Sequence, residues 1–389
     1  MQFARAAWKF LVAIKDGMVL IAMLLFFGAL YALLSSQPNS AAIRDGALLL
    51  DLNGVIVEEP AAPKIEDFLS GSSDSPREYR LRDVVHAIDA SAADDRVKAI
   101  VLDLGRFAGG GQTSLTDVGA ALDRAKKAGK PVYAFASFYS DDSYQLAAHA
   151  TQIWLDPMGG IIFAGPGGNR LYYKGLMDQL GVTANIYRVG TYKSAVEPYM
   201  RSDQSPAARE ASQALYGVLW DSWLGEVTKA RPQAVIRPFA DDPATFARTA
   251  GGDLAKVAMQ QKLVDTDETP SPDSFKSIDY DDFIAASPVD SDGSPIGVIT
   301  VAGEIVDGKT GPGMAASGRI AEQIYKALDE DEIKALVVRI DSPGGSAFAS
   351  EEIRLALLEA RKKKLPIVVS MGDVAASGGY WVATARDHI

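Results

Sequence analysis

The sequence predicts an α/β protein built from two copies of one β-α-β unit, preceded by a single membrane-crossing helix. Two sequence segments occur in both copies. VKAIVLDLGRFAGGG (Val97–Gly111) returns as IKALVVRIDSPGGS (Ile333–Ser346), and DVGAALDRAKKAGKPVYAF (Asp117–Phe135) returns as EIRLALLEARKKKLPIVVS (Glu352–Ser370). Each copy is a buried strand, a glycine loop, an amphipathic helix with a basic end, a proline and a second buried strand. Such a unit places its strands parallel, with a right-handed crossover.

The N-terminal sequence predicts a membrane anchor. Residues Met18–Leu34 carry no charge and are nearly long enough to span a hydrocarbon core. Mostly basic residues precede this run, so residues 1–17 are expected in the cytoplasm and the chain after the anchor on the other side. The alternative is a cleaved signal peptide that uses Ser40–Ala42, but that site lies well past the apolar run.

The remaining chain divides into three predicted regions. Residues 46–268 form the first copy, residues 269–295 form a linker rich in Asp, Ser and Pro, and residues 296–389 form the second copy. The second copy stops soon after its second strand. By comparison with the first copy, we expect it to be truncated.

The first copy continues beyond its second strand through several predicted helices. The strongest is Pro206–Ala230, for which Ser205 supplies an N-cap and Pro206 the first helical residue. The others are Leu171–Gly181, Ala244–Thr249 and Leu254–Gln261.

Composition excludes several kinds of chemistry. A formal net charge of −11 argues against nucleic acid as a partner, because phosphate binding needs a basic surface. The absence of cysteine removes thiol catalysis and thiolate zinc sites. The three histidines form no local zinc motif, and only they could complete a Ser-His-Asp triad. We therefore expect no metal and no cofactor.

The candidate nucleophile is Ser377, in MGDVAASGGYWVA (Met371–Ala383). The segment follows a buried strand and opens a predicted helix, and the N–H of Gly378 at that helix start suits a developing oxyanion. The alternative is a tight turn in which Ser377 merely caps the helix. In the first copy the aligned residue is Asp141, so that copy lacks a nucleophile.

A second glycine turn, DSPGGS (Asp341–Ser346), follows the neighbouring strand. The N–H groups of Gly344 and Gly345 can face a ligand there. Both turns therefore lie at the carboxyl edge of one sheet, where ligands bind in such folds. The alternatives are an ordinary turn or a phosphate loop, although no Lys-Ser/Thr follows in the register of a Walker motif.

These motifs resemble one family. SPGGS, GDVAASGGYWVA and YRVGTYKSAVEPYMR (Tyr187–Arg201) are similar to segments of the signal peptide peptidase A (protease IV) family in its long, duplicated form. That family is similar in fold to Clp protease and the crotonases. The resemblance implies a tandem duplication of a Clp/crotonase-like superhelical domain and a Ser/Lys dyad, with Ser377 as nucleophile and Lys193 as general base. Gly344 or Gly345, with Gly378, would form the oxyanion hole.

The lysine assignment depends on the resemblance. Lysine acts as a base only as the free amine, which needs a lowered pKa. From the residues alone, Lys193 could equally be a solvated loop lysine. Whether Lys193 and Ser377 meet within one chain or between chains stays open at this point.

The resemblance also implies a function and a location. It predicts a serine endopeptidase, single-pass in the bacterial inner membrane with its catalytic part in the periplasm. This enzyme would hydrolyse cleaved signal peptides or other hydrophobic peptides and assemble as a homo-oligomer, a tetramer by resemblance. Two alternatives remain: a crotonase-like acyl-CoA enzyme and a non-catalytic envelope scaffold.

Overall fold

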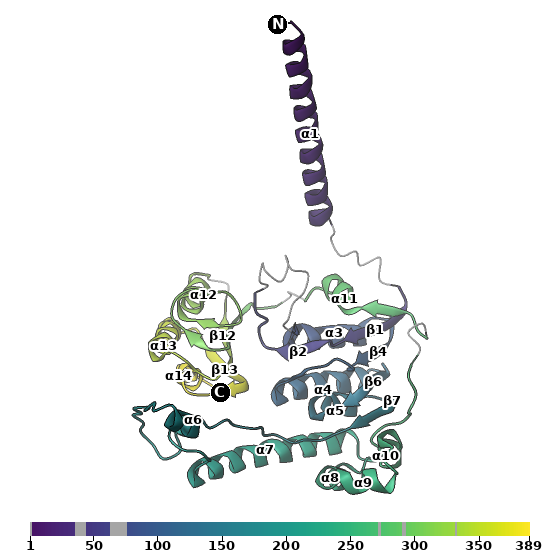
Figure 1. Ribbon diagram of the computed structural model, residues 1–389, viewed down its shortest axis with the longest axis vertical. Helices are drawn as coiled ribbons and strands as arrows, with labels where there is room; N and C mark the ends of the chain where they lie inside the picture. Colours follow the sequence, from purple (N-terminus) through teal and green to yellow (C-terminus); the bar gives the residue numbers. More distant parts are fainter. Residues whose placement is uncertain (1, 36–43, 63–75, 271–273, 290–292, 331–332) are drawn as a thin grey trace.

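The computed structural model describes residues 2–35, 44–62, 76–270, 274–289, 293–330 and 333–389. A long N-terminal helix stands apart from two α/β units that lie side by side (Figure 1). We call residues 44–289 the first unit and residues 293–389 the second unit. The predicted α/β class with parallel sheets is confirmed.

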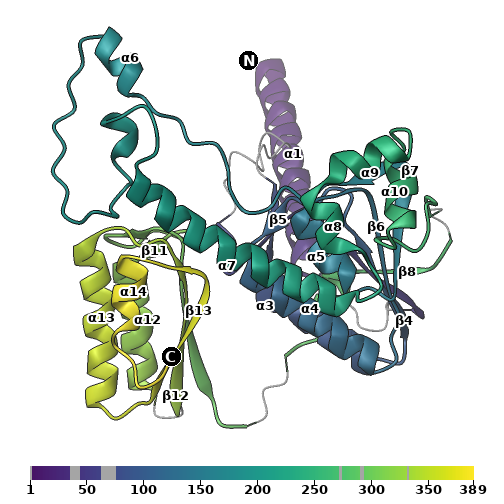
Figure 2. The same ribbon diagram turned by 90° about the horizontal axis from the view of Figure 1, so that it is seen from below.

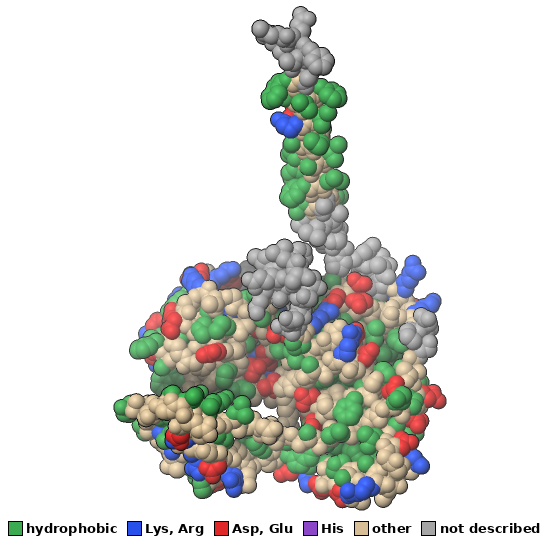
Figure 3. All heavy atoms as spheres, in the orientation of Figure 1, with side chains coloured by type: hydrophobic (Ala, Val, Ile, Leu, Met, Phe, Trp, Pro, Cys, Tyr) green, Lys and Arg blue, Asp and Glu red, His purple; other side chains and the backbone are tan. Residues whose placement is uncertain are grey.

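Helix α1 (Gln2–Ser35) is long and apolar enough to cross a membrane. Its most apolar stretch is Trp8–Gly28, with a mean hydropathy of 2.3 and no part buried, and apolar side chains cover it on the visible face (Figure 3). This stretch begins earlier than the predicted span of residues 18–34. The prediction started after Lys15 and Asp16, whereas the structure places both inside the helix as an ion pair of 2.9 Å.

The core of the first unit is a five-stranded parallel sheet in the order β7-β6-β4-β1-β8. Apolar strand residues such as Leu48, Leu50 and Leu102 are fully buried beneath the helices, which explains why these runs form strands. The strands are β1 (Gly46–Asp51), β4 (Val97–Asp103), β6 (Val132–Tyr139), β7 (Gln152–Ile161) and β8 (Ser277–Asp279). The helices between them are α3 (Leu81–Ala93), α4 (Gln112–Lys127) and α5 (Asp141–Ala148). A small parallel sheet adds β2 (Gly54–Val57), β3 (Arg77–Arg80) and β5 (Gly109–Gly110).

An extended segment, residues 162–204, leaves the sheet of the first unit after β7; we call it the arm. It contains α6 (Lys174–Gln179) and a short 3₁₀ helix (Glu197–Tyr199), and it reaches toward the side of the second unit that carries α13 and α14 (Figures 1 and 2). The chain returns through α7 (Pro206–Ala230), where Ser205 Oγ accepts a hydrogen bond from Ala208 N at 3.1 Å. The predicted bounds and cap of this helix are confirmed. The following helices are α8 (Ile236–Asp241), α9 (Pro243–Thr249) and α10 (Leu254–Gln260).

The expectation that residues 269–295 are only a linker was wrong for part of that range. Strand β8 pairs in parallel with β1 and extends the sheet of the first unit. Helix α11 (Tyr280–Ala286) follows, and its Phe283 is fully buried in the core of that unit. The many Asp and Ser residues that suggested a linker include Asp279, which instead caps α11 by accepting hydrogen bonds from Asp281 N and Asp282 N.

The second unit repeats the order of elements in the first. Its parallel sheet has the order β13-β12-β9, as β6-β4-β1 does in the first unit. The elements are β9 (Ile296–Ala302), β10 (Ile305–Val306), β11 (Ala315–Ala316), α12 (Ser317–Asp329), β12 (Ala335–Ser342), α13 (Ala347–Lys362), β13 (Ile367–Ala375) and α14 (Gly378–Ala383).

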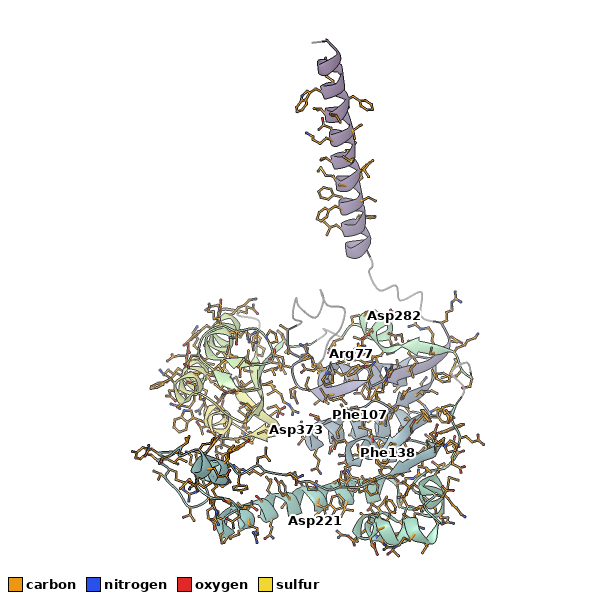
Figure 4. The ribbon with its side chains drawn as sticks, viewed as in Figure 1. Arg77, Phe107, Phe138, Asp221, Asp282 and Asp373 are labelled. Carbon is orange, nitrogen blue, oxygen red and sulfur yellow. The ribbon has the colours of Figure 1, made fainter. Side chains whose placement is uncertain are left out.

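The two units have separate apolar cores and meet through polar contacts. Arg339 on β12 forms a largely buried ion pair with Glu58 of the first unit, with Nε 2.7 Å from Oε1. Arg319 lies 3.5 Å from Glu59. Asp373, at the boundary in Figure 4, contacts the start of α4. This boundary therefore holds the carboxyl end of β13 against the first unit.

Candidate active site

Ser377 occupies a strained turn between β13 and α14. Its φ is +49° and its ψ is −116°, in the left-handed region that a residue with a Cβ rarely adopts. Its side chain makes no capping hydrogen bond to the helix. Strain of this kind persists only where the surroundings impose it, and it concentrates at functional sites. The hydroxyl is thereby left free at a helix N-terminus.

The first unit provides an internal comparison. Ser140 precedes α5 as Ser377 precedes α14, but Ser140 has an ordinary φ of −90° and forms a capping box with Ser143. The sequence alignment had placed Asp141 opposite Ser377; counted from the helix starts, Ser140 is the counterpart. The Asp141 carboxylate accepts hydrogen bonds from Ala164 N (2.9 Å) and Gly165 N (3.2 Å), so it anchors the start of the arm. The alternative predicted for Ser377, a serine that merely caps a helix, is therefore the arrangement found at Ser140.

The DSPGGS turn packs directly against Ser377. A Cβ at position 344 would lie 2.7 Å from Ser377 Cβ and 2.6 Å from Gly378 N, so only glycine fits there. A Cβ at position 345 would lie 2.1 Å from the carbonyl oxygen of Ile305. Ser342 Oγ fixes the turn, because it donates to Gly303 O (2.6 Å) and accepts from Gly344 N (3.1 Å). The two glycine turns predicted to converge are therefore brought together.

Two backbone donors remain for a ligand. The N–H of Gly344 is already bonded to Ser342 Oγ. The N–H groups of Gly345 and Gly378 have no hydrogen-bond partner within the described part of the chain. Gly378 N lies at the start of α14, although that helix is short. Since both glycines flank Ser377 in one groove, they can donate to an oxygen atom beside its hydroxyl.

An open groove of about 520 Å³ runs past Ser377. Two of the side chains that line it are Phe348, which is 87% exposed, and Trp381. Trp381 Nε1 donates to Glu351 Oε2 at 2.7 Å, and Arg354 forms a two-pronged ion pair with the same carboxylate. These hydrogen bonds, from Arg354 first and then Trp381, lower the pKa of Glu351 to about 2. The groove thus presents apolar walls held by a fixed polar support.

Lys193 lies in the arm, exposed to solvent. Its carbonyl oxygen accepts from Arg188 Nη1 at 3.0 Å, and the neighbouring Tyr192 hydroxyl donates to Glu210 Oε2 on α7 at 3.2 Å. The groove lining does not include Lys193, and no hydrogen bond between described residues joins it to Ser377. The structure therefore brings Ser377, Gly344, Gly345 and Gly378 together and leaves Lys193 outside that cluster.

Comparison with known proteins identifies the family. The family model "Peptidase family S49" matches residues 124–269 and 359–389, stretches that contain Lys193 and Ser377. "Protease 4" of Salmonella typhi is 38% identical over all of this chain and 66% of its own length. "Protease 4" of Haemophilus influenzae is 35% identical over all of this chain and 68% of its own length.

The chain belongs to peptidase family S49. It spans about two thirds of the length of these two family members. Among solved structures, an enoyl-CoA hydratase/isomerase family protein from Silicibacter pomeroyi is 17% identical, covering 44% of this chain and 86% of that one. Its TM-score is 0.18, too low to support an argument about the fold. Family membership confirms the resemblance drawn from the serine and lysine motifs.

Sequence reasoning missed several residues of this site. Phe348, Glu351 and Trp381 shape the groove, and Ser342 fixes the glycine turn. Ser342 stood inside the quoted DSPGGS motif, and a small polar residue before Pro-Gly-Gly could have been singled out as its anchor. In the described parts of the chain, no group of three or more His, Asp or Glu residues could hold a metal ion.

Proposed function

We propose that the protein is a membrane-anchored serine peptidase in which Ser377 is the nucleophile. The observation that carries this proposal is the strained, uncapped Ser377 beside two backbone N–H groups that no described residue accepts from, in a member of peptidase family S49. A helix cap gains nothing from such a conformation, whereas a nucleophile needs a hydroxyl that is exposed and free to change partners.

Lys193 is the proposed general base, and its support is the family motif together with its place on the arm. The arm reaches toward the side of the second unit on which α13 and α14 lie, which makes an approach to the groove feasible by a change of the arm alone (Figure 2). The second route is a Lys193 supplied by another copy of the chain. In either case a lysine that becomes buried beside Ser377 would favour the free amine over the ammonium ion.

The chemistry follows from this arrangement. The Lys193 amine takes the proton of Ser377 Oγ as that oxygen attacks the carbonyl carbon of the peptide bond. The developing oxyanion accepts hydrogen bonds from Gly345 N and Gly378 N. The resulting ammonium then passes the proton to the leaving nitrogen as the C–N bond breaks, which leaves an acyl ester on Ser377. The free amine next takes a proton from water as the water attacks the ester carbonyl, and returns that proton to Ser377 Oγ as the ester bond breaks. No metal or cofactor takes part in this proposal.

The groove favours hydrophobic peptide substrates, such as cleaved signal peptides. Its exposed Phe348 and Trp381 offer apolar surface to an extended chain. Helix α1 would hold the site near the membrane surface, with the N-terminus in the cytoplasm and the two units in the periplasm of a bacterium. The arm exposes apolar side chains, including Tyr187 (94%) and Val189 (91%), which supports assembly with further copies. The repeated order of elements supports a tandem duplication.

Labelling with a fluorophosphonate probe tests the nucleophile and the base separately. The wild-type protein in detergent should be labelled at Ser377, and Ser377→Ala should not be labelled at all. Lys193→Ala should lower the rate by about 10²–10⁴-fold, the usual contribution of a general base. Lys174→Ala is the matched control, because Lys174 lies on the same arm but pairs with Asp178. It should react like wild type.

Each failure has a distinct meaning. Labelling that survives Ser377→Ala sinks the nucleophile assignment. A rate unchanged by Lys193→Ala from mildly acidic to alkaline pH removes the base but leaves the nucleophile standing. A folded wild-type protein that is never labelled favours a scaffold, and binding of an acyl-CoA in the groove favours the crotonase-like alternative.

A further inference from the structure

Asp373 joins the two units immediately before the proposed nucleophile. It lies on β13, four positions before Ser377, and its carboxylate reaches the first unit (Figure 4). Asp373 Oδ1 accepts hydrogen bonds from Thr113 N (2.7 Å) and Ser114 N (3.1 Å), and Oδ2 accepts from Ser114 Oγ (2.5 Å). Ser114 is fully buried, so the two bonds to Ser114 are partly shielded from water, whereas the bond to Thr113 N is exposed.

The carboxylate takes the place of a missing helix cap. In α4 the N-cap residue is Gly111, which has no side chain, and the donors Thr113 N and Ser114 N are the two that an N-cap side chain normally satisfies. A Cβ at position 111 would lie 1.8 Å from Asp373 Cγ. The absence of a side chain at position 111 therefore leaves space in the first unit for a cap from the second unit. The positive end of the helix dipole of α4 also favours the negative charge of the Asp373 carboxylate.

Asp373 lies in an irregular part of β13, and its side chain points toward the first unit. Ile340 pairs with Met371 and Ser342 pairs with Ala375, so one residue of β12 faces three of β13. Such bulges redirect side chains and are frequent beside active sites. Asp341 Oδ1 holds the bulge by accepting from Val374 N at 2.8 Å. The chain then passes through Ala375 and Ala376 into the strained Ser377.

We infer that Asp373 is a positioning residue: by capping α4 of the first unit, it fixes the end of β13 and thereby the strained conformation of Ser377. This inference rests on the proposed function, because it assigns a role in placing the nucleophile. Asp373 does not line the groove that contains Ser377, so it acts through the backbone rather than on the substrate.

The test separates capping from positioning. Asp373→Ala removes both, and should lower the melting temperature by about 2–4 °C and the fluorophosphonate labelling rate by about tenfold or more, because small displacements of a nucleophile cost about that much or more. Asp373→Asn keeps an oxygen for the two backbone donors and an amide for Ser114 Oγ. It should label within about threefold of wild type, as Asn and Asp cap equally well.

The decisive variant is Gly111→Ser combined with Asp373→Ala. Serine at the N-cap fills the vacated space and caps α4 from its own unit, so the melting temperature should recover. Labelling should stay low, and amide hydrogen exchange over residues 372–380 should stay faster than in wild type. Gly111→Ser alone should be destabilising, since its Cβ meets Asp373. Gly111→Ser should thus lower the melting temperature when Asp373 is present and raise it when Asp373 is replaced by alanine. The difference between these two effects measures the coupling between positions 111 and 373.

Two results would overturn the inference: labelling of Asp373→Ala at the wild-type rate, or recovery of labelling together with stability in the double variant. Either would make Asp373 a helix cap and nothing more. If wild-type protein is not labelled but the exchange over residues 372–380 responds as described, the peptidase proposal fails and the positioning role stands. If that exchange does not respond, the positioning role fails, whatever the labelling shows.

Discussion

Ser377 Cβ packs against the backbone of Gly344 in the space that a side chain at position 344 would need. A Cβ at that position would be 2.7 Å from Ser377 Cβ. Gly344→Ala should therefore displace Ser377 and reduce fluorophosphonate labelling by about 100-fold or more. The backbone of Gly344 also has a positive φ of 97°, so part of any loss of stability will be backbone strain.

Gly308→Ala isolates that strain. Gly308 has a φ of 90°, but nothing lies within 4 Å of its missing Cβ. It should lower the melting temperature by a few degrees and leave labelling unchanged. Equal labelling by the two alanine variants would show that contact between position 344 and Ser377 is unimportant.

Phe348 should bind substrate without stabilising the fold. Its side chain is 87% exposed in the groove, so Phe348→Ser should leave the melting temperature unchanged and raise KM for a hydrophobic peptide by about tenfold, the value of one lost apolar contact. Tyr325→Ser, at a 47% exposed position outside the groove, is the control in the same unit. An equal effect of both substitutions on KM would contradict the groove as the peptide site.

The ion pair between Arg339 and Glu58 should contribute strongly to the contact between units. Both side chains are largely buried, and Glu58→Ala leaves the guanidinium without its main partner, at a cost of about 3 kcal/mol in the free energy of unfolding. Glu322→Ala breaks the exposed pair with Lys309 and should change little. Denaturant unfolding measures both, and comparable small losses would mean that the boundary is held by other contacts.

Asp142 should destabilise the protein at neutral pH. Burial raises the pKa of its carboxyl above the ordinary value, and the nearby Asp141 and Asp373 add to this, while the Gly110 N–H opposes it. A raised pKa means that the folded state prefers the protonated acid. Its favourable contribution is complete below the ordinary pKa and is lost as the pH rises through the raised one. Asp142→Asn should therefore raise the melting temperature by about 1–3 °C at pH 7 and give almost no gain at about pH 3, below the ordinary pKa.

The pKa of Asp156 is shifted in the opposite direction from that of Asp142. Hydrogen bonds from Met158 N and then Thr269 Oγ lower the pKa of its carboxyl, so its contribution is present above the ordinary pKa and is lost as the pH falls through the lowered one. Asp156→Asn should reduce stability at pH 7, and this loss should shrink toward acid pH. The same direction of change for both variants at pH 7 would refute the pKa shifts.

Local patterns predicted the parts of the fold that depend on neighbours in sequence. Helix α7 begins and ends where its proline, its serine cap and its composition indicate, and the convergence of the two glycine turns followed from the order of parallel strands. Ser377 was found because small residues cluster around it. Its strained φ could not be predicted, since the glycine that packs against Ser377, Gly344, lies in a turn after a different strand.

Contacts between distant residues were the ones missed. Asp373 and Ser114 are 259 positions apart, and neither has a local pattern that indicates the other. Residues 277–286 had the composition of a linker because of their many polar side chains, yet Ile278 and Phe283 are buried in the core of the first unit and dock the segment. Lys193 stays a prediction, because its approach to Ser377 needs an arrangement of the arm that the chain alone does not adopt here.

The cap on α4 also has a consequence for the order of biosynthesis. The ribosome finishes residues 111–114 long before it reaches residue 373, so a first unit that folds before then has one helix end still open to water. On the positioning role inferred for Asp373, the event that closes this helix end is the same event that aligns the hydroxyl of Ser377. A nascent chain in which residue 373 has not yet reached the first unit would then carry no working protease, and activity would begin only when the second unit docks on the first.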